Sequence, residues 1–332
     1  MKHNHPKIEI MDTTLRDGEQ TSGVSFVPHE KLMIARLLLE ELKVDRVEVA
    51  SARVSEGEFD AVRMICDWAA RRNMLPKVEV LGFVDGRTSV DWIHATGCRV
   101  INLLCKGSLK HCNCQLKKTP EEHIKDILAV VDYANEQDME VNIYLEDWSN
   151  GMKDSPEYVF LLMDALVQTN IKRYMLPDTL GILNPLQVIG FMRKMVKRYP
   201  QAHFDFHAHN DYDLAVSNVL AAVLSGCKGL HTTINGLGER AGNAPLASVQ
   251  AILKDHFNAI TNIDENRLND VSRVVESYSG IVIPANKPIV GENVFTQVAG
   301  VHADGDNKSN LYCNDLLPER FGRKREYALG KN

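Results

Sequence analysis

The stretch Phe206-His207-Ala208-His209-Asn210-Asp211 joins a short strand-like pattern, residues 203–206, to an apolar pattern with helical spacing that starts after Asp213. Residues two apart on a strand share a face, so His207 and His209 point the same way where this strand ends. Two imidazoles side by side suit a divalent metal ion. Two structural histidines would give the same pattern, so the other polar residues must decide.

Short apolar runs like this one recur along the chain, and a longer helical pattern follows each. The eight runs cover residues 8–11, 46–50, 77–83, 99–104, 140–145, 173–176, 203–207 and 229–234. Eight strand–helix units in about 250 residues predict an α/β fold of the (β/α)8 or TIM-barrel type. An open doubly wound sheet is the alternative. Its nucleotide-binding form expects Gly-x-Gly-x-x-Gly after the first strand, where this chain has Asp12-Thr13-Thr14-Leu15-Arg16.

Three of the predicted helices begin with a cap residue followed by proline, at Thr119, Ser155 and Asn184. Thr119 also has Glu122 three residues later, which completes a capping box. After about residue 262 the strand–helix rhythm stops, and helices are expected over 266–278 and 292–300. We therefore expect a catalytic barrel over 1–262 and a small C-terminal helical subdomain over 263–332.

The composition bounds the class of protein. The chain has 332 residues, 44% hydrophobic and 25% charged, which is ordinary for a globular protein with a sizeable core. A net charge of -6 argues against a nucleic-acid partner. Seven scattered cysteines, an odd number, favour reduced thiols and a cytoplasmic protein over a disulfide framework. No apolar run approaches transmembrane length, so no membrane partner is expected.

Polar residues follow most of the predicted strands, and the carboxyl ends of barrel strands meet at one mouth. They are Asp12, Arg16, Asp17 and Gln20 after the first strand, Glu48 at the second, Tyr144 and Glu146 at the fifth, Asp178 and Thr179 at the sixth, and Asn235 at the eighth. The third and fourth strands are expected to end in apolar groups, around Leu81 and Leu104. Burying unpaired charges is costly, so this convergence indicates a functional site.

Asp17 and the two histidines make a ligand set that leaves positions open for a chelating substrate. Arg16 is suited to grip a carboxylate, or it forms a structural ion pair with Asp12 or Glu48. Glu146 is the candidate general base, with a metal-ligand or rim role as the alternative. The loop 236–243 either cradles an anion with its amides or is a turn that brings Asn243 to the metal.

Three motifs together resemble the Claisen-condensing acyltransferases, the family of isopropylmalate, homocitrate and citramalate synthases. They are Asp12–Gln20, His207–Asp211 and Asn235–Asn243. The resemblance covers essentially the whole chain, and it implies that the acetyl group of acetyl-CoA is joined to a 2-oxo acid. It places a divalent metal (Zn, Mn or Mg) at Asp17, His207 and His209, with Asn243 nearby.

The same resemblance implies roles for individual residues. Arg16 would polarise the oxo acid and Glu146 would take a methyl proton from acetyl-CoA. His302 and Tyr312 would reach in from the tail of a partner subunit, in a homodimer with shared active sites. The implied acetyl-CoA contacts are Asp304, Asn310, Leu311 and Tyr312.

The identity of the 2-oxo acid depends on the pocket. Many family members carry a histidine at the end of the third strand, where this chain has Leu81-Gly82-Phe83. The implied substrate contacts are Arg16, Leu81, Leu104, Tyr144 and Thr179. They resemble the pocket of the pyruvate-using citramalate synthases of isoleucine and branched-chain amino-acid biosynthesis. Oxo acids of isopropylmalate or homocitrate synthesis are the alternatives, since one methylene changes discrimination by only about 1–3 kcal/mol. The sequence ends at Asn332, where family synthases continue into a regulatory domain, so that domain is expected to be absent.

Three further classes share parts of this pattern. An aldol-type lyase acting on hydroxymethylglutaryl-CoA would use a similar metal site, but such lyases rely on a cysteine in a glycine-rich loop, and residues 236–243 have none. Non-heme iron oxygenases also use two histidines and a carboxylate, but the barrel and Glu146 argue against that class. An amino-acid-sensing protein would not need Arg16, Glu146 and the metal ligands intact.

Overall fold

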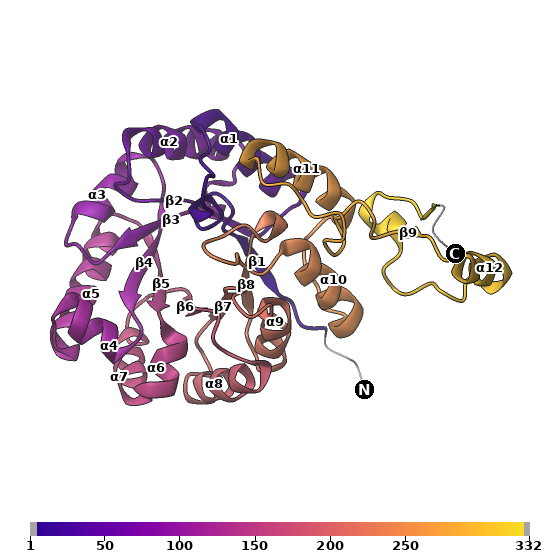
Figure 1. Ribbon diagram of the computed structural model, residues 1–332. Coiled ribbons are helices and arrows are strands. Elements are labelled where there is room, and N and C mark those ends of the chain that lie inside the picture. The colour runs from indigo at the N-terminus through magenta and orange to yellow at the C-terminus, as the bar shows by residue number, and fades with distance from the viewer. Residues whose placement is uncertain (1–4, 329–332) are drawn as a thin grey trace.

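Eight parallel strands form a closed barrel in chain order, with β1 beside β8 (Figure 1). The structure is a computed structural model that describes residues 5–328. The strands are β1 (Glu9–Asp12), β2 (Arg46–Ser51), β3 (Val78–Phe83), β4 (Val100–Lys106), β5 (Glu140–Glu146), β6 (Tyr174–Asp178), β7 (Phe204–Ala208) and β8 (Gly229–Thr232). The predicted (β/α)8 barrel is therefore confirmed. The end of the chain at Asn332 lies outside the described residues.

Helices surround the barrel as an outer ring (Figure 1). They are α1 (Pro28–Arg36), α2 (Glu56–Arg71), α3 (Thr88–Ala95), α4 (Leu109–His111), α5 (Pro120–Glu136), α6 (Trp148–Asp154), α7 (Pro156–Leu166), α8 (Pro185–Arg198), α9 (Ala215–Leu224), α10 (Leu246–Phe257) and α11 (Leu268–Ser279). The last helix, α12 (Gly300–Ser309), lies outside this ring. Within residues 5–328, none of these helices has the length and apolar character needed to cross a membrane.

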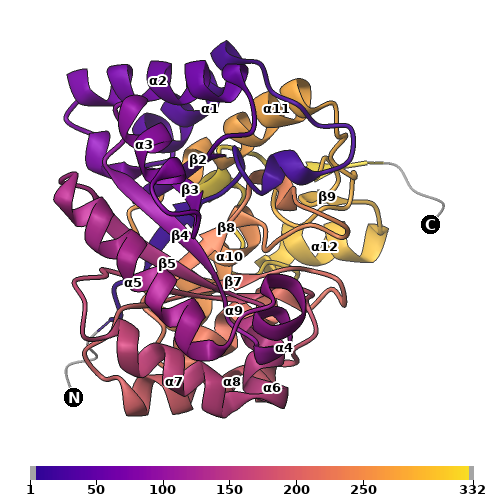
Figure 2. The same cartoon turned by 90° about the vertical axis from the view of Figure 1, so that its left-hand side faces the viewer.

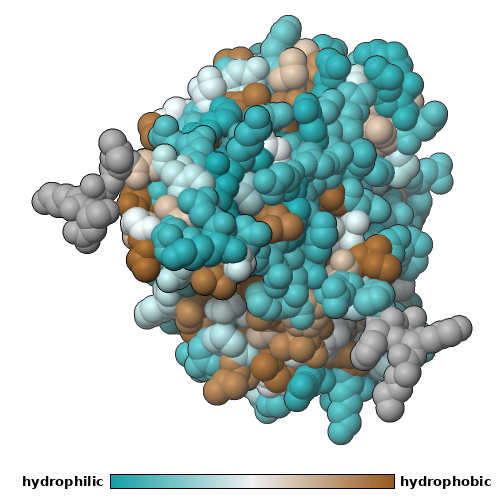
Figure 3. Space-filling model, turned by 90° about the vertical axis from the view of Figure 1, so that its right-hand side faces the viewer, coloured by the Kyte–Doolittle hydropathy of each residue, from teal (hydrophilic) through white to brown (hydrophobic). Residues whose placement is uncertain are grey.

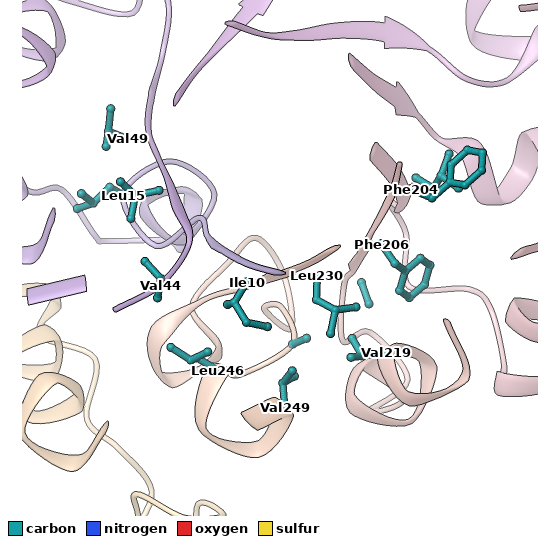
Figure 4. Close-up of a cluster of buried hydrophobic side chains, with 14 of the residues drawn as sticks. Ile10, Leu15, Val44, Val49, Phe204, Phe206, Val219, Leu230, Leu246 and Val249 are labelled. Carbon is teal, nitrogen blue, oxygen red and sulfur yellow. The ribbon is translucent and has the colours of Figure 1, made fainter. Parts of the chain in front are cut away.

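The main core lies between the barrel strands and the helix ring. Figure 4 shows Ile10 of β1 and Leu230 of β8 directed toward Leu246 and Val249 of α10, and all four side chains are buried. Alternate strand residues point to the other face, which in a barrel is its interior. Met11, next to Ile10, lies in a separate apolar cluster with Leu81, Tyr144 and Met175. The two faces of each strand thus have separate tasks, packing outside and lining a site inside.

The predicted helix starts are observed at all three positions, with one difference in chemistry. The Thr119 hydroxyl accepts a hydrogen bond from Glu122 N at 3.2 Å, and Asn184 caps α8 in the same way through Gln187 N at 3.0 Å. Ser155 precedes the first proline of α7, but its hydroxyl accepts instead from Leu109 N at 3.2 Å. This serine therefore ties α4 to the start of α7.

Two sequence-based boundaries are wrong, each for a physical reason. The strand predicted to end in apolar groups at Leu104 continues to Lys106, because β4 stays in register with β5 up to the pair Lys106–Glu146. The helix expected over 292–300 is absent from the described chain. A short strand β9 (Thr296–Gln297) pairs there with β10 (Glu326–Tyr327), and α12 follows. The sequence did not predict α12 because its two glycines and two aspartates have low helix propensity.

The C-terminal part of the chain leaves the barrel in steps. Helix α11 packs against α1 at the edge of the barrel, and the following segment extends outward to α12 (Figure 1). Figure 2 shows α12 toward the same end of the barrel as α4 and α6, which follow β4 and β5. The division of the chain at residue 262 stays a prediction.

Charged groups are also buried near both ends of the barrel strands. Near the amino ends of the strands, Arg46 forms ion pairs with Glu79 at 3.1 Å and with Asp205. Near the other end, Asp12 accepts a hydrogen bond from Thr14 N at 2.9 Å through Oδ1, while Oδ2 is buried without a partner. Burial raises the pKa of Asp12 to about 7. The folded chain therefore favours the protonated form of this carboxyl.

We expect Asp12 to make folding stability fall as the pH rises. In the unfolded chain its pKa is near 3.8, so between that value and about 7 the folded state binds a proton that the unfolded state has lost. Stability contributed by this proton is complete below pH 4 and is lost as the pH rises through 7, by up to about 1.4 kcal/mol per pH unit. Urea unfolding from pH 5 to 8 should show this decline in the wild type, relative to Asp12→Asn. Parallel curves for the two proteins would contradict the prediction.

Candidate metal centre

Asp17, His207 and His209 meet at the carboxyl end of the barrel. Asp17 Oδ2 lies 3.1 Å from His207 Nε2 and 3.8 Å from His209 Nε2, and the two Nε2 atoms are 3.3 Å apart. All three residues are buried, and among residues 5–328 they form the only cluster of three or more histidine, cysteine or acidic side chains with this spacing. The structure therefore brings the predicted ligand triad together.

Local backbone geometry explains why these residues meet. After β1 the chain folds into a tight turn in which the amides of Arg16, Asp17 and Gly18 all donate to the carbonyl of Thr13, at 2.9 to 3.1 Å. This turn directs Asp17 back over the barrel mouth. His207, the penultimate residue of β7, and His209, just after the strand, share a face as their spacing predicted.

The electrostatics suit a cation. Burial opposes the charge on Asp17, but Arg16 and the two histidines lower its pKa well below the usual range. Burial, helped by neighbouring His207, lowers the pKa of His209 to about 4. At neutral pH the triad therefore offers one anionic oxygen and a neutral imidazole nitrogen of His209, in the protonation state that metal binding needs. This donor set fits a divalent ion.

Asn243 reaches the same cluster from the loop after β8. Its side-chain nitrogen donates to Asp17 Oδ2 at 2.9 Å, and its Oδ1 is buried with no hydrogen-bond partner. Gly238 permits this approach, because a Cβ there would lie 2.5 Å from the Asn243 amide. The amides of Gly238, Gly242 and Asn243 all donate within the protein. The loop is thus a turn that places Asn243 beside Asp17, and these amides are not free to cradle an anion.

Arg16 is fixed by a partner on β2. Its Nε donates to Glu48 Oε2 at 2.5 Å, and Nη1 lies 3.5 Å from Asp17 Oδ1. Of the two ion pairs considered for Arg16, the structure has the one with Glu48. Glu48 is itself held by Asn102, whose amide donates to it at 2.7 Å. This series of hydrogen bonds holds the guanidinium at the mouth, with Nη2 3.5 Å from the Tyr144 hydroxyl.

These side chains line a cavity of about 240 Å³. Its lining includes the predicted residues Arg16, Asp17, Leu81, Leu104, Tyr144, Glu146, Thr179, His207 and His209. Leu81, Phe83, Leu104 and Tyr144 give this cavity an apolar wall beside the charged cluster. The size and polarity suit a small acid with one apolar substituent.

Glu146 stands at the rim and forms an ion pair with Lys106, the last residue of β4. Sequence reasoning missed Lys106 because it ended this strand at Leu104. The parallel register of β4 and β5 pairs the two residues directly, so a longer strand would have revealed it.

The predicted residues of the C-terminal segment do not line this cavity. His302 and Asp304 lie on α12, and Asn310, Leu311 and Tyr312 follow it. The His302 ring packs on Tyr312, with centroids 4.1 Å apart. Their expected reach into a partner's site stays a prediction.

Two further residues at the site were not predicted. Arg240 donates to Asp211 at 2.8 Å and to the carbonyl of Thr179 at 2.7 Å, and so joins three loops of the mouth. His231 of β8 lies inside the barrel, 3.1 Å from the Tyr144 hydroxyl. Arg240 stood within a recognised motif, but a lone histidine in an apolar strand gave no signal.

The structure is thus a (β/α)8 barrel with an aspartate and two histidines at the end where barrel enzymes carry their active sites. The HMGL-like family model matches residues 7–275, and the chain belongs to the HMGL-like family. It is 35% identical to an (R)-citramalate synthase of Methanocaldococcus jannaschii over 98% of this chain and 64% of that protein. It is 36% identical to a 2-isopropylmalate synthase of Saccharolobus solfataricus, over 98% and 83%. It is 34% identical to a homocitrate synthase of Sulfolobus acidocaldarius, over 99% and 69%.

Solved structures support the fold. A hydroxymethylglutaryl-CoA lyase from Bacillus subtilis superimposes with a TM-score of 0.68 at 20% identity, covering 84% of this chain and 96% of that one. The carboxyl transferase domain of Rhizobium etli pyruvate carboxylase gives 0.63 at 15% identity, covering 83% and 48%. The barrel is therefore shared with proteins of divergent sequence.

We expect Asp17→Asn to weaken Mn²⁺ or Zn²⁺ binding by more than about tenfold, because it removes the only anionic ligand of the triad. Isothermal titration of the metal-depleted protein measures this directly. Asp270→Asn, on the exposed side of α11, is the matched control and should bind like the wild type. Equal affinity of the wild type and Asp17→Asn would show that the ion sits elsewhere.

Proposed function

We propose that the protein condenses acetyl-CoA with a small 2-oxo acid, pyruvate, to give citramalate and free CoA. The observation that carries this proposal is that Arg16 and the ligand triad line the same small cavity as a wall of apolar side chains. A keto acid that chelates a cation at Asp17, His207 and His209 would direct its side chain toward Leu81, Leu104 and Tyr144. The relatives named as synthases support the same reaction class.

A divalent ion at the triad would supply Lewis-acid polarisation of the keto oxygen. Arg16, held by Glu48, would bind the same oxo acid and favour the negative charge that develops on that oxygen. Glu146 would take a proton from the acetyl methyl group, and the resulting enolate carbon would form a bond to the keto carbon. The C=O π pair would move to the keto oxygen, which takes up a proton to become the product's hydroxyl group. Water then cleaves the thioester, which releases CoA as the thiol and makes the condensation irreversible.

The choice of pyruvate depends on the cavity wall. The relatives that act in citramalate, isopropylmalate and homocitrate synthesis have nearly equal identity to this chain, 35, 36 and 34%. Overall similarity therefore does not select the substrate. Leu81 and Tyr144 are almost fully buried in an apolar cluster with Met11 and Met175. Such a wall suits a methyl group better than the carboxylate arm that a homocitrate synthase must accept.

We propose further that two chains assemble with shared sites, because the C-terminal segment carries apolar side chains exposed to solvent. They include Val301, Leu311 and Tyr312, which are 65, 66 and 43% exposed. Figure 3, which shows the face that bears this segment, has patches of apolar side chains on a largely hydrophilic surface. Burial of these groups against a second subunit would bring His302 and Tyr312 to its mouth, with Asp304, Asn310 and Leu311 as acetyl-CoA contacts. A lyase is the second candidate function, supported by the fold shared with hydroxymethylglutaryl-CoA lyases.

A panel of 2-oxo acids tests the substrate proposal. With acetyl-CoA and Mn²⁺ or Zn²⁺, we expect free thiol to appear with pyruvate at a kcat/KM at least about tenfold above that for 2-oxoisovalerate. Larger turnover with 2-oxoisovalerate or 2-oxoglutarate would assign the chain to isopropylmalate or homocitrate synthesis. Release of acetoacetate from hydroxymethylglutaryl-CoA would favour the lyase.

The role of Glu146 as base predicts a separation of binding from turnover. Glu146→Gln should bind metal and pyruvate like the wild type, but lose more than about 100-fold in thiol release, because the amide cannot accept the methyl proton. Calorimetry measures the binding and a thiol assay the turnover. Glu157→Gln, on the exposed face of α7, should leave both unchanged. Turnover retained in Glu146→Gln would refute the role.

A further inference from the structure

His231 is a buried residue of β8 that the proposed reaction does not use. Its Nε2 lies 3.2 Å from Asp205 Oδ2, and its Nδ1 lies 3.1 Å from the Tyr144 hydroxyl. Both ring nitrogens therefore have hydrogen-bond partners: Nε2 has Asp205 near the amino ends of the strands, and Nδ1 has Tyr144 in the cavity wall. Among the described residues, His231 alone contacts both Asp205 and Tyr144 by hydrogen bonds.

The partners of His231 fix the direction of the hydrogen bond to Tyr144. Asp205 is held as a carboxylate by Arg46 and can only accept, so Nε2 of the imidazole carries the hydrogen. In neutral imidazole the other nitrogen, Nδ1, is then an acceptor. The Tyr144 hydroxyl has two acceptors within reach, His231 Nδ1 at 3.1 Å and Glu48 Oε2 at 3.4 Å, and the shorter contact assigns its hydrogen to the imidazole. The phenolic oxygen is left as an acceptor, and Arg16 Nη2 stands 3.5 Å from it.

The orientation of Tyr144 matters because this ring is both a wall and a contact of the proposed site. It packs in the apolar cluster with Leu81 and Met175, and the Arg16 guanidinium lies 5.8 Å from its centroid. The ring of His231 meets it edge to face at 5.4 Å. A small rotation of Tyr144 would change both the space for the substrate's side chain and the environment of Arg16.

We infer that His231 is a positioning residue for selectivity: anchored by Asp205, it holds Tyr144 through one hydrogen bond and so fixes the apolar wall that a 2-oxo acid meets. This inference rests on the proposed function for its substrate class. It assigns to the barrel interior a role in discriminating between oxo acids that differ by one methylene. His231 itself does not line the cavity and acts only through Tyr144.

The experiment is a double-mutant cycle with His231→Gln, Tyr144→Phe and the double variant. Each single change should raise KM for pyruvate about threefold to tenfold, the worth of one hydrogen bond, with a smaller effect on kcat. Each should also lower the preference for pyruvate over 2-oxobutanoate. The double variant should be no worse than Tyr144→Phe alone. Effects that multiply would overturn the inference. His256→Gln, exposed on α10, is the matched control and should behave like the wild type.

Two measurements separate the alternatives. The His231 ring also lies 5.5 Å from that of His207. Weaker Mn²⁺ binding by His231→Gln, in proportion to its loss of kcat/KM, would mean that it acts through the metal ligand and would overturn the inference. Nitrogen NMR of the imidazoles requires no activity. It should report hydrogen on Nε2 of His231 and a shift of Nδ1 in Tyr144→Phe. An unchanged Nδ1 overturns the inference, whereas a wild type that turns over no oxo acid overturns only the proposed function.

Discussion

The charge on Asp17 is the interaction on which the candidate site depends. A buried carboxylate is costly unless cations or hydrogen-bond donors surround it, and Asp17 has Arg16 on one side and two histidines on the other. These partners come from opposite parts of the chain, and only closure of the barrel beside β8 brings them together. Arg16 is restrained in turn by Glu48, so strands β1, β2 and β7 form one electrostatic unit.

Much of this unit was predictable, because it follows from two simple periodicities. Strand–helix alternation gives the barrel, and the barrel places all strand carboxyl ends at one mouth. The shared face of His207 and His209 was predicted from their spacing, and the place of Asp17 at the mouth from its position after the first strand. Membership in the HMGL-like family agrees with the motifs that carried the resemblance. The structure thus contains the features that short sequence patterns encode, the barrel strands and the shared face of the two histidines.

Other features depend on distant partners, and no local pattern encodes those. Lys106 was missed because the apolar pattern of this strand ends before the lysine. Only the register with β5 shows that the strand continues to it. His231 was missed because its neighbours in β8 are ordinary strand residues. The proposed roles of His302 and Tyr312 are of a third kind, since they require a second chain. Register, interior packing and assembly are each set by contacts between residues far apart in sequence.

The cluster of Arg46, Glu79 and Asp205 determines by which end of the barrel a ligand can enter and leave. These side chains are 5, 1 and 0% exposed, and they plug the barrel near the amino ends of its strands. The barrel interior is therefore filled at its amino end, and the cavity opens only at the carboxyl end of the strands. Whatever enters at the mouth must leave by the same opening, in the reverse direction. A segment that covers this opening would therefore control both substrate entry and product release.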